Sequence, residues 1–149
     1  MRWNASTHAG FSSAPPWLPL GNRLDKHNVA DQRRDRASIY QLHRRLIDLR
    51  HRRKALLFGG YGTVRADADL LVFTRELESE QILVALNFGE EPTAARFASG
   101  EWVGRMLISS AGDREGEAVR GCIELRAHEG AVVELSEKVG EPEARSRAS

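Results

Sequence analysis

A regular succession of short β-forming runs after residue 60 is the feature that most limits what this chain can fold into. Turn-forming or charged spacers separate the runs, which recur about every 8–12 residues, a spacing typical of an antiparallel sandwich or barrel. We therefore expect a mainly β protein, with an antiparallel β-sandwich over residues 60–136 and a charged, flexible tail over 137–149. The runs lie at 62–65, 70–75, 81–88, 93–97, 104–109, 122–125 and 131–135.

One amphipathic helix is predicted immediately before these runs, over residues 38–57. Its apolar residues recur at helical spacing and form one stripe, which Ile47 widens. Ser38 and Gln41 have the spacing of a capping box, in which each side chain bonds the other residue's backbone amide. The stripe consists of Ile39, Leu42, Leu46 and Leu49.

The first 35 residues show neither helical nor strand periodicity. They contain three prolines and many turn-forming residues, yet they also carry aromatic side chains that disordered tails usually lack. A structureless segment of this length is unusual inside a compact domain. We expect a long irregular loop that packs Trp3, Phe11 and Trp17 onto a partner outside this chain.

The charge is uneven although the net charge is only +1. Residues 33–54 carry nine basic and two acidic side chains, whereas residues 65–149 carry ten basic and seventeen acidic ones. The basic run allows two interpretations: a nucleic-acid surface that binds phosphates, or the solvated face of the amphipathic helix. We favour the solvated face and expect no nucleic-acid partner, because only one helix is basic.

Several kinds of site find little support in the sequence. The lone Cys122 excludes an intrachain disulfide, and we expect it to be a small buried side chain. The residues Glu76, Glu78 and Glu80 fall in a turn, where we expect solvated charges. We expect no cofactor and no metal, since the histidines lack ligand spacing. Neither a membrane span nor a signal peptide is evident, so we expect a cytoplasmic protein. The histidines are His8, His27, His43, His51 and His128.

Short strings over residues 1–90 resemble, in order and spacing, the α-glucosidases of glycoside hydrolase family 13, which include oligo-1,6-glucosidases and trehalose synthases. Residues 1–11 resemble the family's M-x-W…A-G-F segment, and residues 16–20 resemble its P-W-L-P-V. Asn28, Val29 and Gln32 fit N-V-x-x-Q. Further matches cover the S-I-Y…R-L-I-x-L-R helix at 38–50, A-L-x-x-G-x-Y at 55–61 and the L-N-F ending at 86–88.

The resemblance implies a place within a larger enzyme. Residues 1–58 would be the end of a catalytic (β/α)8 barrel, with a loop over 1–35 and the last barrel helix over 36–58, and residues 60–136 would be the C-terminal sandwich. The family's catalytic carboxylates lie upstream of the M-x-W segment, so the resemblance implies no catalytic residue here and a chain that is inactive alone. The missing barrel would be its partner, and an α-glucoside or oligosaccharide the substrate of the intact enzyme.

The resemblance also implies that Trp3, Asn4 and Phe11 lie on a loop at the active face, where they could border outer sugar subsites. The alternative, which we favour for the two aromatic residues, is that they pack this loop onto the barrel. In Asn4 the chain departs from the family's more usual Asp.

A second function remains open: a stand-alone, non-catalytic carbohydrate-binding or accessory β-sandwich. A row of exposed aromatic residues on one sheet face would favour it. The available residues are Phe73, Phe88, Phe97 and Trp102, and the strand pattern predicts that the first three lie in the core.

Overall fold

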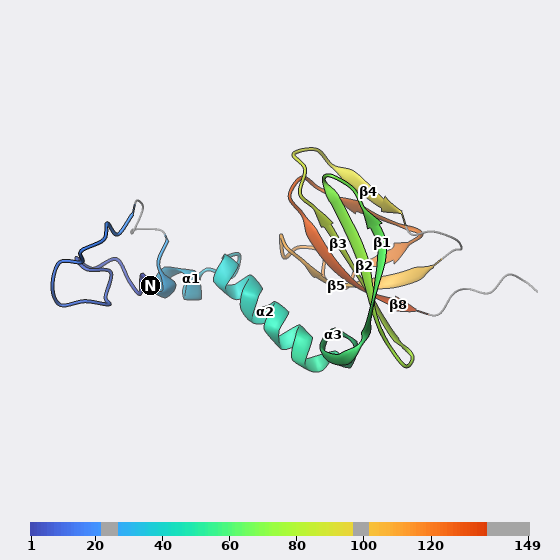
Figure 1. The fold of residues 1–149 in the computed structure, drawn as a ribbon, viewed down its shortest axis with the longest axis horizontal. Helices are drawn as coiled ribbons and strands as arrows, with labels where there is room; N and C mark the ends of the chain where they lie inside the picture. The colour runs from blue at the N-terminus through green and yellow to red at the C-terminus, as the bar shows by residue number, and fades with distance from the viewer. Residues whose placement is uncertain (22–26, 97–101, 137–149) are drawn as a thin grey trace, which may run out of the picture. The chain divides into compact units, whose positions relative to one another are not determined.

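The computed structural model describes residues 1–21, 27–96 and 102–136 and divides the chain into two units (Figure 1). The N-terminal unit is Met1–Arg52 and the C-terminal unit is Arg53–Ser149. Phe97 and the expected tail at 137–149 lie outside the described residues.

The C-terminal unit is an antiparallel β-structure, as the spacing of the β-forming runs predicts. Its eight strands form one sheet in the order β1-β2-β3-β8-β5-β6-β7-β4. The short strand β6 had no counterpart among the predicted runs. The strands are β1 (Gly60–Ala66), β2 (Leu70–Leu77), β3 (Glu80–Asn87), β4 (Thr93–Arg96), β5 (Val103–Ser109), β6 (Ala118–Arg120), β7 (Cys122–Leu125) and β8 (Gly130–Ser136).

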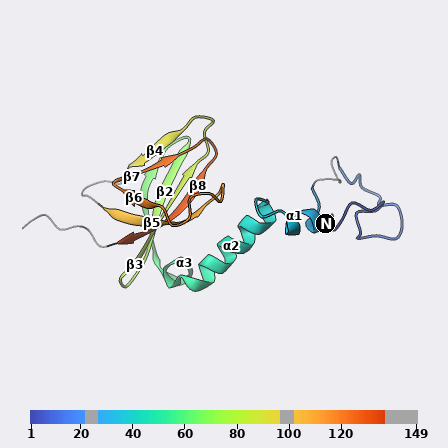
Figure 2. The same ribbon diagram turned by 180° about the vertical axis from the view of Figure 1, so that it is seen from behind.

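The main core lies inside this folded-over sheet, because β4, β6 and β7 cover one face of β2, β3 and β8 (Figure 2). Alternation along the strands supplies the core, as β8 shows with buried Ala131, Val133 and Leu135 and only half-buried residues between them. Trp102 is buried in the same cluster. The remaining members are Leu70, Val72, Leu83, Ala85, Ala95, Met106, Val119, Ile123 and Leu125.

A second apolar cluster lies on the opposite face of β3. Ile82 and Val84 are buried there against Ala55 from the short helix α3 (Lys54–Phe58). Phe73 is partly buried at the edge of this cluster. Strand β3 is therefore apolar on both faces, which explains why its sequence reads as a continuous apolar run.

The β2–β3 hairpin corrects two expectations. Glu80 is not a solvated turn charge: it begins β3, and its carboxylate accepts a hydrogen bond of 2.7 Å from the Ala55 amide. Phe88 was expected in the core, but β3 ends at Asn87 and the Phe88 side chain is 60% exposed. Glu78 takes the left-handed conformation at φ 54° and closes the hairpin.

The N-terminal unit contains α1 (Val29–Arg34) and α2 (Ile39–Arg52). The first 35 residues are therefore not irregular throughout, because α1 forms where the Asn28 side chain accepts a hydrogen bond from the Asp31 amide. A continuous helix over 36–58 was also wrong. It breaks at Arg53, whose backbone is extended at φ −112° and ψ 105°, and it resumes as α3.

The start of α2 bears out half of the predicted capping box. Ser38 Oγ accepts from the Gln41 amide at 3.3 Å, but the Gln41 side chain donates to the Arg33 carbonyl instead of returning to Ser38. The apolar stripe of α2 is largely in solvent: Ile39 is 68% exposed and Ile47 54%, and Leu49 alone of the stripe is buried.

Candidate functional site

A tight loop at the start of the chain brings together the residues expected to border a sugar site. The amides of Trp3 and Asn4 both donate to the Ala9 carbonyl, at 2.8 and 3.3 Å. The loop can turn back because Ala9 and Gly10 both take positive φ, 54° and 72°. Phe11 follows at once, its amide donating to the His8 carbonyl.

Asn4 has a structural role inside this loop. Its Oδ1 accepts from the Ser6 amide at 3.0 Å, a local bond typical of Asn in turns. A Cβ on Gly10 would lie 2.6 Å from Asn4 Nδ2, so the two residues depend on each other. An Asp here would accept the same hydrogen bond, and the departure from the family pattern leaves the turn intact.

A hollow of about 530 Å³ lies beside this loop. Phe11 and Trp17 line it, whereas Trp3 and Asn4 do not. Trp17 is 91% exposed, and Trp3 and Phe11 are about half exposed. The other lining residues are Met1, Arg2, Ser12, Pro15, Pro16, Leu18, Pro19 and Leu20.

Backbone hydrogen bonds tie the loop to helix α1. The carbonyls of Arg2 and Trp3 accept from the amides of Val29 and Ala30, at 3.0 and 2.9 Å. These amides lie in the first turn of α1, where a helix has no internal partners for its N–H groups. The position of the loop is therefore set by the start of α1.

The N-V-x-x-Q string gains a physical explanation here. Asn28 caps α1, and Gln32 Oε1 accepts from the Tyr40 amide in the first turn of α2. The Gln32 carbonyl accepts from Ser38 Oγ at 2.6 Å. The motif thus caps two successive helices, a role that the sequence did not reveal for Gln32.

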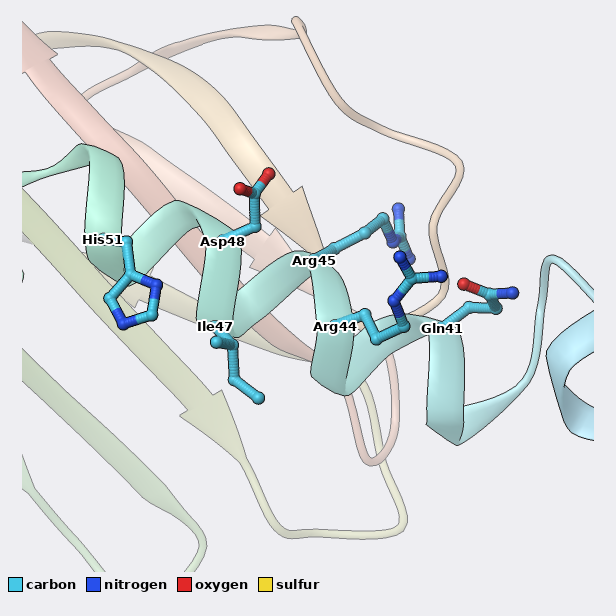
Figure 3. Close-up of a pocket in the computed structure, with 6 residues that line it drawn as sticks. All are labelled: Gln41, Arg44, Arg45, Ile47, Asp48 and His51. Carbon is cyan, nitrogen blue, oxygen red and sulfur yellow. The ribbon is translucent and has the colours of Figure 1, made fainter. Parts of the chain in front are cut away.

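A second hollow follows the polar side of α2 (Figure 3). Arg44 and Arg45 lie toward the end that Gln41 occupies, and His51 lies at the other end. Asp48, in the middle, pairs with Arg52 at 2.9 Å. The surface mixes both charges along one helix, so its geometry favours a solvated face over a phosphate-binding track. Gln41 and Ile47 complete the lining.

The most buried charge in the described residues of the C-terminal unit is Glu129, whose side chain is 2% exposed. It pairs with Arg126 at 2.8 Å and with Arg114 at 3.4 Å, and it accepts from Ser109 Oγ at 2.9 Å. Arg126 also forms two hydrogen bonds of 2.7 Å to Asp113. We call these five residues the Glu129 cluster.

The cluster holds its carboxylates ionised. Burial alone would raise the pKa of Glu129, but hydrogen bonds from the Arg126 side chain and backbone and from Ser109 outweigh it and lower the pKa to about 2. The Arg126 side chain likewise lowers the pKa of Asp113 to about 2. A carboxyl so held is a poor general acid near neutral pH, so the cluster is suited to joining two turns and not to acid catalysis.

Sequence reasoning missed the Glu129 cluster because its members are scattered over residues 109–129 without a motif. The sequence feature that could have indicated it is the pair Arg126 and Glu129, at i and i+3 across the turn that precedes β8. Cys122 is half-buried, and burial raises the pKa of its thiol, so it is neither the fully buried side chain we expected nor an activated nucleophile.

Within residues 1–21, 27–96 and 102–136, no three His, Cys, Asp or Glu side chains converge as a metal site would require. In the same ranges no helix has the length and apolarity needed to cross a membrane.

Comparison with known proteins finds one family. Residues 1–59 match the model of the alpha amylase catalytic domain. The chain is 36% identical over 103 residues to an oligo-1,6-glucosidase of Heyndrickxia coagulans, a match that covers 68% of this chain and 19% of the relative. It is 30% identical over 105 residues to the trehalose-6-phosphate hydrolase of Escherichia coli (strain K12), again covering 68% and 19%.

Solved structures agree over more of the chain. Trehalulose synthase MutB from Pseudomonas mesoacidophila MX-45 superimposes with a TM-score of 0.84 at 29% identity, over 91% of this chain and 24% of that protein. One structure of this synthase is a mutant in complex with the substrate sucrose. The chain thus spans about one fifth of the length of the curated relatives it matches.

Proposed function

Because this chain is a relative of the α-glucosidases of the α-amylase family, glycoside hydrolase family 13, we propose that it is the C-terminal portion of an enzyme acting on α-linked glucosides. One observation carries the proposal. The match to the catalytic-domain model ends at residue 59, and the sandwich begins with β1 at Gly60. A boundary between two domains of a larger enzyme explains both.

The proposed chemistry is hydrolysis or transfer of glucosyl groups with retention of configuration. Retention requires two carboxyl groups about 5–5.5 Å apart, one as nucleophile and one as acid and base. In a barrel enzyme such groups lie at the ends of several strands. The proposal places residues 1–58 after the last of those strands, so a chain without the strands is inactive.

The proposed partner is the rest of the catalytic barrel, joined covalently or supplied as a separate chain. The exposed stripe of α2 supports this proposal, because an amphipathic helix gains its stability by burying its apolar side. Ile39 and Ile47 are each more than half exposed, and Trp17 in the preceding loop is 91% exposed. A barrel would cover apolar area that the chain itself leaves in water.

The sequence favours packing onto the barrel for Trp3 and Phe11. The hollow beside the loop supports the other alternative for Phe11, so within the restored enzyme we place the loop of Trp3, Asn4 and Phe11 at the border of the outer sugar subsites. Phe11 is the strongest of the three, since it lines the hollow beside Trp17 and its aromatic side chain is about half exposed. Asn4 acts by holding the loop through its bond to Ser6. The Phe11→Ala variant should raise KM for an oligosaccharide with little change in kcat.

The experiment compares two proteins on a chromogenic nitrophenyl α-glucoside: this chain, and a longer chain that extends the reading frame upstream of Met1 through a whole barrel. We expect turnover by the longer chain and none by this chain above a mock preparation. Turnover by this chain alone would contradict the proposal, and so would an upstream frame that encodes no barrel.

A second candidate is a stand-alone carbohydrate-binding module, favoured by Tyr61. This side chain is 59% exposed and its ring lies 5.2 Å from that of Phe73, tilted by 31°. Exposed rings of this kind can stack on sugars. Binding of isomaltose or maltose that is lost in Tyr61→Ala, by a chain with no upstream barrel, would favour the module over the enzyme.

A further inference from the structure

Helix α3 is joined to the sandwich by charged groups at both of its ends, in addition to its apolar side. At its start, Arg53 forms two hydrogen bonds to Glu134 on β8, of 2.6 and 2.9 Å, and lies 3.6 Å from Glu80 on β3. At its end, Arg75 Nη2 donates to the Gly59 carbonyl at 2.8 Å. These bonds come from three neighbouring strands of one sheet.

Two contacts satisfy backbone groups that a short helix cannot satisfy by itself. Glu80 accepts from the Ala55 amide at 2.7 Å, in the first turn, where a negative charge is also favoured by the helix dipole. Arg75 donates to a carbonyl just beyond the last turn. A five-residue helix is far too short to be stable alone, so its conformation depends on these contacts with the sheet.

Helix α3 and its last residue pack closely against the sheet. A Cβ at Gly59 would lie 2.8 Å from the Glu76 carbonyl oxygen, so a residue with a side chain does not fit there. Ala55 is completely buried on Ile82 and Val84. The Arg53, Glu80 and Glu134 side chains are only about one quarter to one third exposed, which strengthens their pairing compared with fully exposed ion pairs.

We propose that the outer face of β2, β3 and β8 is a docking surface for segment 53–59, the end of the catalytic domain, and that Arg53 with Glu80 and Glu134 is the clamp that closes it. The match to the catalytic-domain model includes α3, although α3 packs on the sandwich. In the proposed enzyme this segment is the covalent link between the catalytic domain and the sandwich. The inference rests on the proposed function only in calling this segment the end of a catalytic domain.

The clamp should open without unfolding the sandwich. The main core contains no residue of α3, so release of 53–59 removes contacts of the second cluster and the polar contacts of Arg53, Ala55 and Gly59, and leaves the main core in place. Such a local opening is a separate equilibrium with a smaller free energy than global unfolding. It should respond to substitutions at the clamp, whereas the unfolding of the sandwich should hardly respond.

Trypsin reports on this opening directly. To cleave after Arg53, trypsin must bind the Arg53 guanidinium in its specificity pocket, so this group must first leave Glu134 and Glu80. Arg34, whose side chain is 83% exposed and which lies far from segment 53–59 in the sequence, provides an internal reference. The measurement is the rate of cleavage after Arg53 and after Lys54 in the full chain under native conditions, with sites identified by mass spectrometry.

We expect Glu134→Gln to raise the rate of cleavage after Arg53 and Lys54 about tenfold. The substitution replaces the carboxylate that accepts both hydrogen bonds from Arg53 with a neutral amide. Arg53→Lys keeps the charge and the trypsin site but loses the forked geometry, and it should raise the rate by a smaller factor. The matched control is Asp48→Asn, which removes the exposed pair with Arg52 and should change the rate after Arg53 less than twofold.

Two results would overturn the inference. One is an equal rate of cleavage after Arg53 in the wild type and Glu134→Gln. The other is an increase that appears together with a comparable loss of strand circular dichroism, which would mean that α3 and the sandwich unfold as one. A failed activity test with a closed clamp would contradict the proposed function and leave the docking of 53–59 intact.

Discussion

The C-terminal unit buries a continuous apolar core between its own strands, whereas the N-terminal unit leaves most of its large apolar side chains in solvent. Leu83, Ile123 and Val133 are completely buried in the former. In the latter, Trp17 and Ile39 are 91% and 68% exposed. Apolar burial is the main favourable term in folding. The C-terminal unit therefore obtains this stabilisation from its own residues, whereas the N-terminal unit does not.

The largest effect should come from the core of the sandwich. Leu83→Ala removes a completely buried side chain and should lower the free energy of unfolding by about 2–5 kcal/mol. Leu46→Ala, at a position 36% exposed on α2, should change it by less than about 0.5 kcal/mol. Denaturant unfolding followed by circular dichroism measures both. Equal effects would contradict the contrast between the units.

Much of this contrast was readable from the sequence because strand periodicity and burial coincide in the sandwich. The seven predicted runs correspond to seven of the eight strands, and β6 was missed because three residues are too few to show a period. The break between α2 and α3 was also missed. Arg53 fits a helix by propensity, and its extended backbone is fixed by partners on distant strands.

The candidate site was less predictable for a different reason. Asn4, Gln32 and Glu129 act through hydrogen bonds whose partners depend on the fold. The family pattern marked the positions of Asn4 and Gln32, but it did not reveal what either residue bonds. Glu129 belongs to no sequence pattern. Its burial and its pairing with Arg114 and Arg126 depend on the folded turns and could not be predicted from the sequence.

The Glu129 cluster provides the next largest effect. Glu129→Gln leaves Arg126 and Arg114 without their shared buried carboxylate and should lower the free energy of unfolding by about 2–3 kcal/mol. Its matched control is Glu117→Gln, which removes a 44% exposed partner of Arg114 and should cost less than about 1 kcal/mol. An equal loss of unfolding free energy in Glu117→Gln and Glu129→Gln would show that the burial of Glu129 does not determine its contribution to stability.

Acid should weaken the C-terminal unit through the same cluster. The pKa values of Glu129 and Asp113 are lowered in the folded state from 4.5 and 3.8 to about 2. Their contribution is therefore complete above about pH 5 and is lost as the pH falls toward 2, because the unfolded chain then binds protons more readily. The melting temperature should fall across this range, less steeply in Glu129→Gln. A pH-independent melting temperature would contradict the assignment.

The smallest effect on stability should come from the stripe of α2. Replacing both Ile39 and Ile47 with Gln should leave the melting temperature of the sandwich unchanged, since both side chains are more than half exposed. The same change should reduce the binding of a hydrophobic dye by the chain. A clear loss of sandwich stability, or dye binding that does not change, would show that these side chains already have a partner.

The most direct test of the account is amide hydrogen exchange along the whole chain, read by mass spectrometry without added catalytic domain. The account predicts strong protection in β2, β3 and β8 and rapid exchange in α1 and α2, because the N-terminal unit lacks the barrel that would bury its apolar side chains. Protection of α2 equal to that of β3 would contradict it. That result would mean that both units fold from this chain alone.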